Sequence, residues 1–220
     1  MTRVKTFLIG LGMILGIASG GTAFAEEGSR YAVTITNLTQ GQVLTPPTVI
    51  THSEGFTLFI PGIPAYPELE ALAEDGMTGP MMGLLSGLPA VHESMTASSP
   101  LMPGGSVTVE IHARGMFNRL SVAGMLATTN DGFFALRGVK IPRKGEQTFE
   151  AVAYDAGSEG NSESCAYIPG PPCGNGGVRD TGTAEGFVHV HSGIHGIGDL
   201  DPAMHDWNNP VAEITVSRLD

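Results

Sequence analysis

The sequence predicts an all-β protein built as an antiparallel β-sandwich. Apolar and polar residues alternate in the runs 33–36, 107–111 and 212–217, a pattern typical of strands that bury one face. Further short apolar runs are bounded by Gly, Pro or Asn-Asp. These additional expected strands are 48–51, 56–60, 120–126, 133–139, 147–154 and 186–191. Nine short strands favour a sandwich over a parallel sheet.

Residues 67–76 break the alternation and predict one short helix in a connection. Pro67 and Glu68 stand in its first turn and Gly76 ends it, as is typical of helix termini. The apolar run 81–88 that follows is either a buried connection or an exposed patch for a partner, and core filling is the commoner explanation. The chain has no repeat and no long linker, so we expect residues 26–220 to form a single domain.

The first 25 residues predict a signal peptide. Arg3 and Lys5 give a basic start, residues 7–18 form an apolar run, and residues 23–25 read Ala-Phe-Ala, a small-x-small cleavage site. The apolar run is shorter than the roughly 18 residues that span a bilayer, and no later segment reaches that length. We therefore expect no membrane span and a periplasmic or secreted location.

The chain is acidic, with 11 basic and 22 acidic residues and a net charge of −11. Because the leader contains two basic residues and no acidic ones, its removal would shift the net charge to −13. Nucleic acid is disfavoured as a partner, since binding a polyanion needs a concentrated basic surface. The acidic surplus favours solubility and supplies oxygen ligands for hard cations such as calcium.

Two cysteines, Cys165 and Cys173, lie eight positions apart. In an oxidising exported compartment this pair predicts a disulfide that closes a small loop. A loop this short adds about 2–3 kcal/mol of stability at most. The alternative, a metal site made from the two thiolates, lacks partners at the usual spacing.

Five short blocks follow one another along the chain: 31–39 (YAVTITNLT), 51–56 (THSEGF), 72–76 (LAEDG), 130–133 (NDGF) and 154–159 (YDAGSE). Together they resemble the N-terminal domain of the spondins, over residues 31–218, in the form of a bacterial single-domain protein. The resemblance implies an immunoglobulin-like β-sandwich that binds calcium and serves in extracellular adhesion and recognition. The 220 residues contain no thrombospondin-type repeat, so the partners of the animal proteins are not carried over, and the extracellular or envelope ligand stays unnamed.

Asp131, Asp155 and Glu159 are the candidate calcium ligands. We expect them in two loops at one end of the sandwich, and Gly157 lets the backbone between the last two turn tightly. Calcium takes six to eight oxygens at about 2.3–2.6 Å, so backbone carbonyls and water would complete the shell. The spondin resemblance implies the same three acids, with Glu159 where the animal domain has Asp. The alternative is that both blocks are ordinary turn sequences.

A second candidate site is formed by histidines. His189 and His191 share one face of an expected strand, and His195 follows after a turn that could fold it back. His52 and His205 are more distant candidates. Clustered imidazoles bind zinc or copper, so the alternative function is a copper or zinc binding protein of the periplasm or cell surface. The competing interpretation is a set of hydrogen-bonded or solvent-facing histidines.

Catalytic motifs are missing from the sequence. It contains no Gly-x-Ser-x-Gly elbow, no His-Glu-x-x-His, no Walker loop and no dinucleotide fingerprint between a strand and a helix. Metal-dependent hydrolysis needs a base beside an activated water, and no residue stands out for that role. The sequence therefore predicts a calcium-binding adhesion or recognition module without enzymatic activity.

Overall fold

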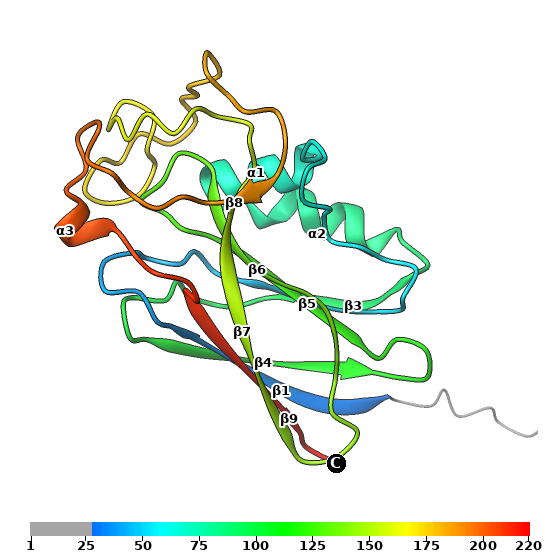
Figure 1. Cartoon of the computed structure of the whole chain (residues 1–220). Coiled ribbons are helices and arrows are strands. Elements are labelled where there is room, and N and C mark those ends of the chain that lie inside the picture. Colours follow the sequence, from blue (N-terminus) through cyan, green and yellow to red (C-terminus); the bar gives the residue numbers. More distant parts are fainter. Residues whose placement is uncertain (1–27) are drawn as a thin grey trace, which may run out of the picture.

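The computed structural model describes residues 28–220, so the predicted signal peptide lies outside the described residues (Figure 1). The described chain contains nine strands and three helices: β1 (Ser29–Asn37), β2 (Thr48–His52), α1 (Pro67–Asp75), α2 (Thr78–Ser86), β3 (Val91–Thr96), β4 (Ser106–Ala113), β5 (Arg119–Met125), β6 (Gly132–Lys140), β7 (Glu146–Asp155), β8 (His189–Val190), α3 (Pro202–His205) and β9 (Ala212–Arg218). All strand pairs are antiparallel, which confirms the all-β prediction.

The strands form a nearly closed sheet in the order β3-β2-β5-β6-β7-β9-β1-β4, with β8 beside β7. The first part of β7 pairs with β9 and its last four residues pair with β6, so this strand links the two halves of the sheet. The edge strands β3 and β4 meet through side chains. Glu93 Oε2 of β3 accepts a hydrogen bond from His112 N of β4 (2.6 Å), and Thr51 Oγ1 of the neighbouring β2 donates to His112 O (2.7 Å).

The three alternating runs lie side by side as β9, β1 and β4. Val33, Ile35 and Ile214 point into the main core, while Thr34 faces outward and its hydroxyl lies 2.8 Å from that of Thr108. Period-two alternation is visible here because one face of each strand is buried and the other is solvated.

The expectation of one short helix is wrong. Helix α1 forms as predicted and ends at Gly76, whose φ of 65° suits glycine. A second nine-residue helix, α2, follows it; α1 lies over β5 and β6, and α2 lies beside α1 against β3 (Figure 1). Their buried side chains form a second core against the sheet, with Leu69, Leu72, Met81 and Leu85 packed near Phe133. Met81 and Leu85 of the apolar run thus fill a core.

Two strand predictions are also corrected. Residues 56–60 are irregular, and their apolar side chains, Leu58 and Phe59, are buried in the second core instead of entering the ladder. β3 was not predicted, because its side chains are mostly half-buried and show no alternation. The run 186–191 forms only the two-residue strand β8. The remaining predicted strands are confirmed.

The predicted disulfide is present. Cys165 and Cys173 are bonded, with their Cα atoms 4.8 Å apart. Within residues 28–220, no helix has the length and apolar character needed to cross a membrane.

Candidate metal centre

The start of β6 and the end of β7 lie at the end of the sheet where the long loops gather (Figure 1), and Asp131 and Asp155 lie next to each other there. Asp131 directly precedes β6 and Asp155 ends β7, and the ladder places Gly132 opposite Asp155. The backbone N–H of Ala156 donates to the carbonyl of Asp131 (3.2 Å). Adjacent antiparallel strands therefore position both acids, and both side chains are fully buried.

The carboxylate of Asp131 is held by one oxygen only. Its Oδ2 accepts hydrogen bonds from Ser158 N (2.7 Å), Ser158 Oγ (3.1 Å) and Glu159 N (3.0 Å). Its Oδ1 is buried and has no hydrogen-bond partner. A buried polar atom without a partner is costly, so this oxygen is a candidate ligand atom.

Burial shapes the electrostatics of this pair. Burial and, secondarily, the neighbouring charge of Asp155 raise the pKa of Asp131 to about 8. The pKa of Asp155 is also raised, again mainly by burial. Two adjacent buried carboxylates are stabilised at neutral pH either by a shared proton or by a cation.

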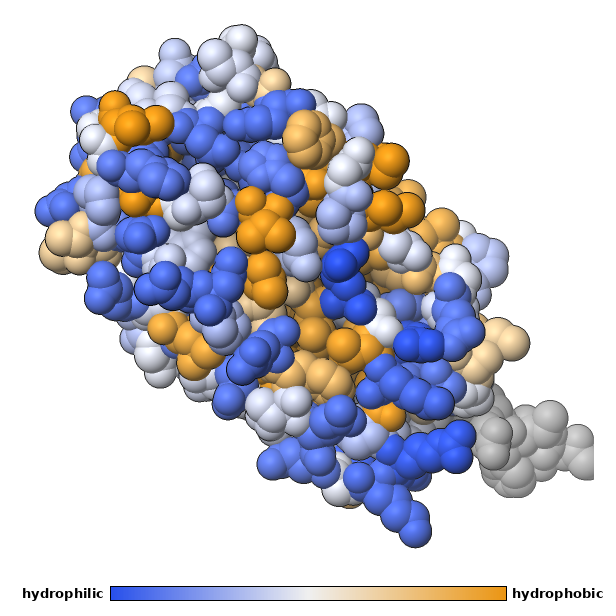
Figure 2. All heavy atoms as spheres, in the orientation of Figure 1, coloured by the Kyte–Doolittle hydropathy of each residue, from blue (hydrophilic) through white to orange (hydrophobic). Residues whose placement is uncertain are grey.

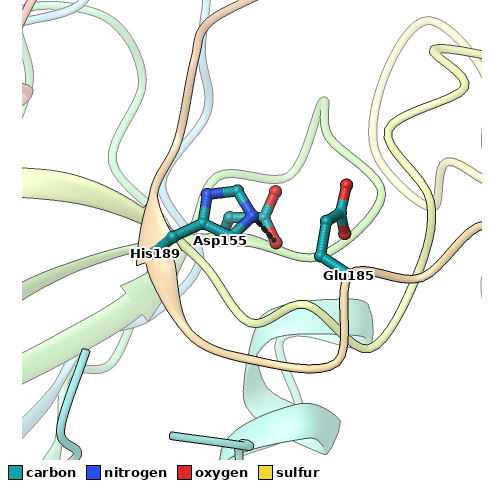
Figure 3. Close-up of side chains that lie close together, drawn as sticks. All are labelled: Asp155, Glu185 and His189. Atoms are coloured by element: carbon teal, nitrogen blue, oxygen red, sulfur yellow. Dashed lines mark ion pairs between the residues drawn. The ribbon is translucent and has the colours of Figure 1, made fainter. Parts of the chain in front are cut away.

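Asp155 also belongs to a second grouping, with Glu185 and His189 (Figure 3). One ligand atom from each residue lies within 4.8 Å of the others, and in the described chain no other three His, Cys, Asp or Glu residues meet this condition. His189 Nε2 lies 3.5 Å from Asp155 Oδ1. His189 Nδ1 lies 3.0 Å from the carbonyl of Val190, which places the proton on Nδ1 and leaves the Nε2 lone pair facing the acids.

Two details of this grouping were not foreseen. Glu185 lies in the exposed loop before β8, and the only sequence signal for it is an acid four positions before His189. Asn161 donates through Nδ2 to Asp155 Oδ2 (2.5 Å) and to Glu185 Oε1 (3.3 Å). Asn161 thus fixes the two acids with respect to each other.

The third predicted calcium ligand, Glu159, contacts Asp131 through its backbone N–H and not through its carboxylate. Its N–H contacts Asp131, whereas its buried carboxylate accepts from Asp180 N (3.0 Å) and lies 3.4 Å from Arg179 Nε. Arg179 also forms ion pairs with Glu74 and Asp75 of α1. Burial raises the pKa of Glu159 to about 7. Glu159 and Arg179 therefore tie the loop to α1.

In the described chain, the ring nitrogens of the predicted cluster, His189, His191 and His195, do not form a group within 4.8 Å of one another. His191 is buried, accepts a hydrogen bond from Gly193 N at Nδ1 (3.0 Å) and packs against Trp207, with ring centroids 5.0 Å apart. Burial lowers the pKa of His191 to about 3. His52 lies at the end of β2, between Ser53 O (2.8 Å) and Ser121 Oγ (2.9 Å). Of the five candidate histidines, His205 included, only His189 groups with Asp155 and Glu185.

His195 is half exposed and lies over Glu163, with Nδ1 3.7 Å from Glu163 Oε1. Glu163 is a buried acid that the sequence did not single out. Its carboxylate accepts hydrogen bonds from the backbone N–H groups of His195 (2.5 Å), Gly196 (2.7 Å) and Ile197 (2.9 Å). It fixes the turn that carries His195.

No protein-family model and no curated protein matches this chain. Its class is therefore defined by structure: an antiparallel β protein whose loops bring buried carboxylates and one imidazole together at one end of a nearly closed sheet.

Proposed function

We propose that the protein is an exported, calcium-binding adhesion or recognition module of the spondin N-terminal type, an immunoglobulin-like β-sandwich without enzymatic activity. The observation that carries this proposal is the buried, unpartnered Oδ1 of Asp131 beside the buried carboxylate of Asp155. The disulfide between Cys165 and Cys173 supports an oxidising, exported location.

Calcium is the cation that this end of the sheet favours on chemical grounds. Asp131, Asp155 and Glu185 supply hard oxygen donors, and calcium accepts an oxygen shell with flexible geometry. A divalent ion there would remove the repulsion between the two buried carboxylates. It would also order the loops at this end, which we propose as the surface that meets an extracellular or envelope ligand.

Calcium binding is tested by thermal unfolding. Calcium bound only by the folded state stabilises by mass action, about 2.7 kcal/mol at one hundred times the dissociation constant. The melting temperature should therefore fall after verified metal removal and recover with calcium. Asp155→Asn should abolish the response, while Glu150→Gln on an exposed position of the same strand should preserve it. An unchanged melting temperature after metal removal would end the calcium assignment.

A second candidate function, zinc or copper binding, is favoured by the convergence of Asp155, Glu185 and His189 within 4.8 Å. One imidazole with two carboxylates is a donor set that zinc accepts. His189→Ala separates the two candidates, because it removes the nitrogen donor and leaves the oxygen donors of Asp131 and Asp155. If calorimetric titration finds zinc binding lost and calcium binding retained in this variant, His189 is a zinc ligand and calcium binds without it. If the wild type binds calcium alone, the second candidate falls.

A further inference from the structure

A cavity of about 450 Å³ lies between the end of β2, the start of β5, the second half of β6 and the turn at 53–58. Its volume falls in the range of about 300–1,000 Å³ that small-molecule sites occupy. Its wall includes His52, Glu54, Phe56, Arg119, Ser121 and Arg137. The cavity is separate from the metal centre. Asp131 directly precedes β6 and Arg137 lies within it, six residues later, so their Cα atoms are about 20 Å apart.

Two arginines give this cavity positive charge in a protein whose net charge is −11. Arg119 Nη1 donates to the carbonyl of Gly138 (3.1 Å), which fixes the guanidinium, and its Nη2 forms an ion pair with Glu54. The Glu54 side chain is 78% exposed, so this acid lies at the rim. Lys140, opposite Arg119 in the ladder, adds a third positive charge nearby.

Arg137, the second arginine of this cavity, is held by aromatic rings and not by an acid. Its guanidinium lies over the rings of Phe59 and Tyr154, 4.9 and 5.5 Å from their centroids. Among residues 28–220, no carboxylate forms an ion pair with it. The aromatic faces hold the guanidinium plane while its N–H groups remain available.

The polar wall behind the arginines is rigid. His52 Nδ1 donates to Ser53 O, His52 Nε2 accepts from Ser121 Oγ, and Ser121 Oγ accepts from Gly138 N (2.9 Å). Both His52 and Ser121 stand at breaks in strand register, and such bulges turn side chains toward functional sites. Phe56 packs edge-on against His52, with centroids 4.9 Å apart, and adds an apolar wall.

We propose that this cavity binds a small organic carboxylate, with its carboxyl group between Arg119 and Arg137 and its apolar body against Phe56. The Glu54 carboxylate on Arg119 indicates the group that this guanidinium accepts, since arginine pairs with planar carboxylates through two parallel hydrogen bonds. In the proposed complex, the ligand carboxylate replaces Glu54 on Arg119 and Glu54 moves into solvent. Hydrophobic side chains interrupt the hydrophilic surface on the face seen in Figure 2, so apolar contacts are accessible on this molecule.

Benzoate is the probe, and benzamide is its uncharged counterpart of the same shape. Isothermal titration calorimetry at constant ionic strength and with chelator present should find benzoate bound at least about tenfold more tightly than benzamide. Arg137→Gln should weaken benzoate binding about tenfold or more. Glu54→Gln should strengthen it, because it removes the internal competitor. Arg143→Gln, at an exposed arginine outside this cavity, should leave it unchanged.

Arg137 is exposed, so its replacement tests binding without endangering the fold. The proposal is overturned by equal binding of benzoate and benzamide, or by no benzoate binding into the millimolar range. It is also overturned if Arg137→Gln and Arg143→Gln weaken benzoate binding equally, or if inorganic phosphate binds as tightly as benzoate. Both results would mean that the protein attracts anions in general. Loss of calcium binding elsewhere does not affect these outcomes, since chelator is present throughout.

Discussion

Metal-free protein should lose stability as the pH rises from 5.5 to 7.5, because of Asp131. Burial and the charge of Asp155 raise the pKa of Asp131 to about 8, whereas an aspartate in an unfolded chain titrates near 3.9. Between these values the folded protein holds a proton that the unfolded chain has released. Each pH unit therefore lowers the free energy of unfolding by about 1.4 kcal/mol, and two units lower it by about 3 kcal/mol.

Asp131→Asn isolates this contribution. The amide oxygen can still accept from the N–H groups of Ser158 and Glu159, and the charge beside Asp155 is gone. Without metal at pH 7.5, the variant should be at least as stable as the wild type, with a pH dependence smaller by about 3 kcal/mol and no response to calcium. Glu159 acts in the same direction as Asp131, so the difference between the two proteins is the informative quantity.

The assay is urea unfolding at pH 5.5, 6.5 and 7.5, with chelator and with calcium. Equal stability of the metal-free wild type at pH 5.5 and 7.5 would refute the electrostatic reasoning. A calcium response that survives in Asp131→Asn would refute the role of Asp131 as a ligand.

Three further changes test other parts of the molecule. Arg179→Gln should lower the free energy of unfolding measured in urea by about 3–5 kcal/mol, because it removes the cation that pairs with the buried Glu159 carboxylate. Arg30→Gln, at the exposed pair with Glu110, should cost less than about 1 kcal/mol. Equal costs for the two variants would contradict the burial argument. Replacing Cys165 and Cys173 with serine should cost about 2–3 kcal/mol at most and leave a strand-dominated circular dichroism spectrum; a loss of that spectrum would mean that the disulfide holds the whole fold. Leu72→Ala should cost about 2–5 kcal/mol by the same urea assay, and a cost below about 1 kcal/mol would mean that α1 buries no core.

The strands that alternation predicts are those with one buried face. In β1, Val33 and Ile35 point inward while Thr34 and Thr36 face outward, so period two is visible in the residues themselves. The helix α1 is visible because Pro67 and Gly76 mark its ends. These signals are local, and no contact distant in sequence is needed to read them.

The missed elements depend on distant contacts. Gly79, Pro80 and Gly83 lower the helix propensity of α2, and its only signal is the i, i+4 spacing of Met81 and Leu85. The run 56–60 resembles a strand because it is apolar, but Leu58 and Phe59 pack in the second core with the helices and Ile60 is exposed. Composition alone does not distinguish an apolar run that forms a strand from one that fills a core without entering the ladder.

The candidate site also has a part that the sequence predicts and a part that depends on distant contacts. Asp131 and Asp155 are predictable as neighbours because they stand at the ends of paired strands. The direction of the Glu159 carboxylate depends on Arg179, twenty positions away, and on α1. Glu185 reaches Asp155 only through the path of the long loop before β8, which no local pattern specifies.

The buried carboxylate of Asp131 also explains how a cation would act on the loops. Three donors hold its Oδ2, two of them from Ser158 and one from Glu159, so the group cannot rotate to give its Oδ1 a partner. The same loop continues to Arg179, which is anchored on α1. A cation between Asp131 and Asp155 would therefore stabilise the end of the sheet that carries the loops, whereas β9, β1 and β4 pack in the main core. Removing the cation should loosen the loop end first and leave the strands of the main core protected from hydrogen exchange.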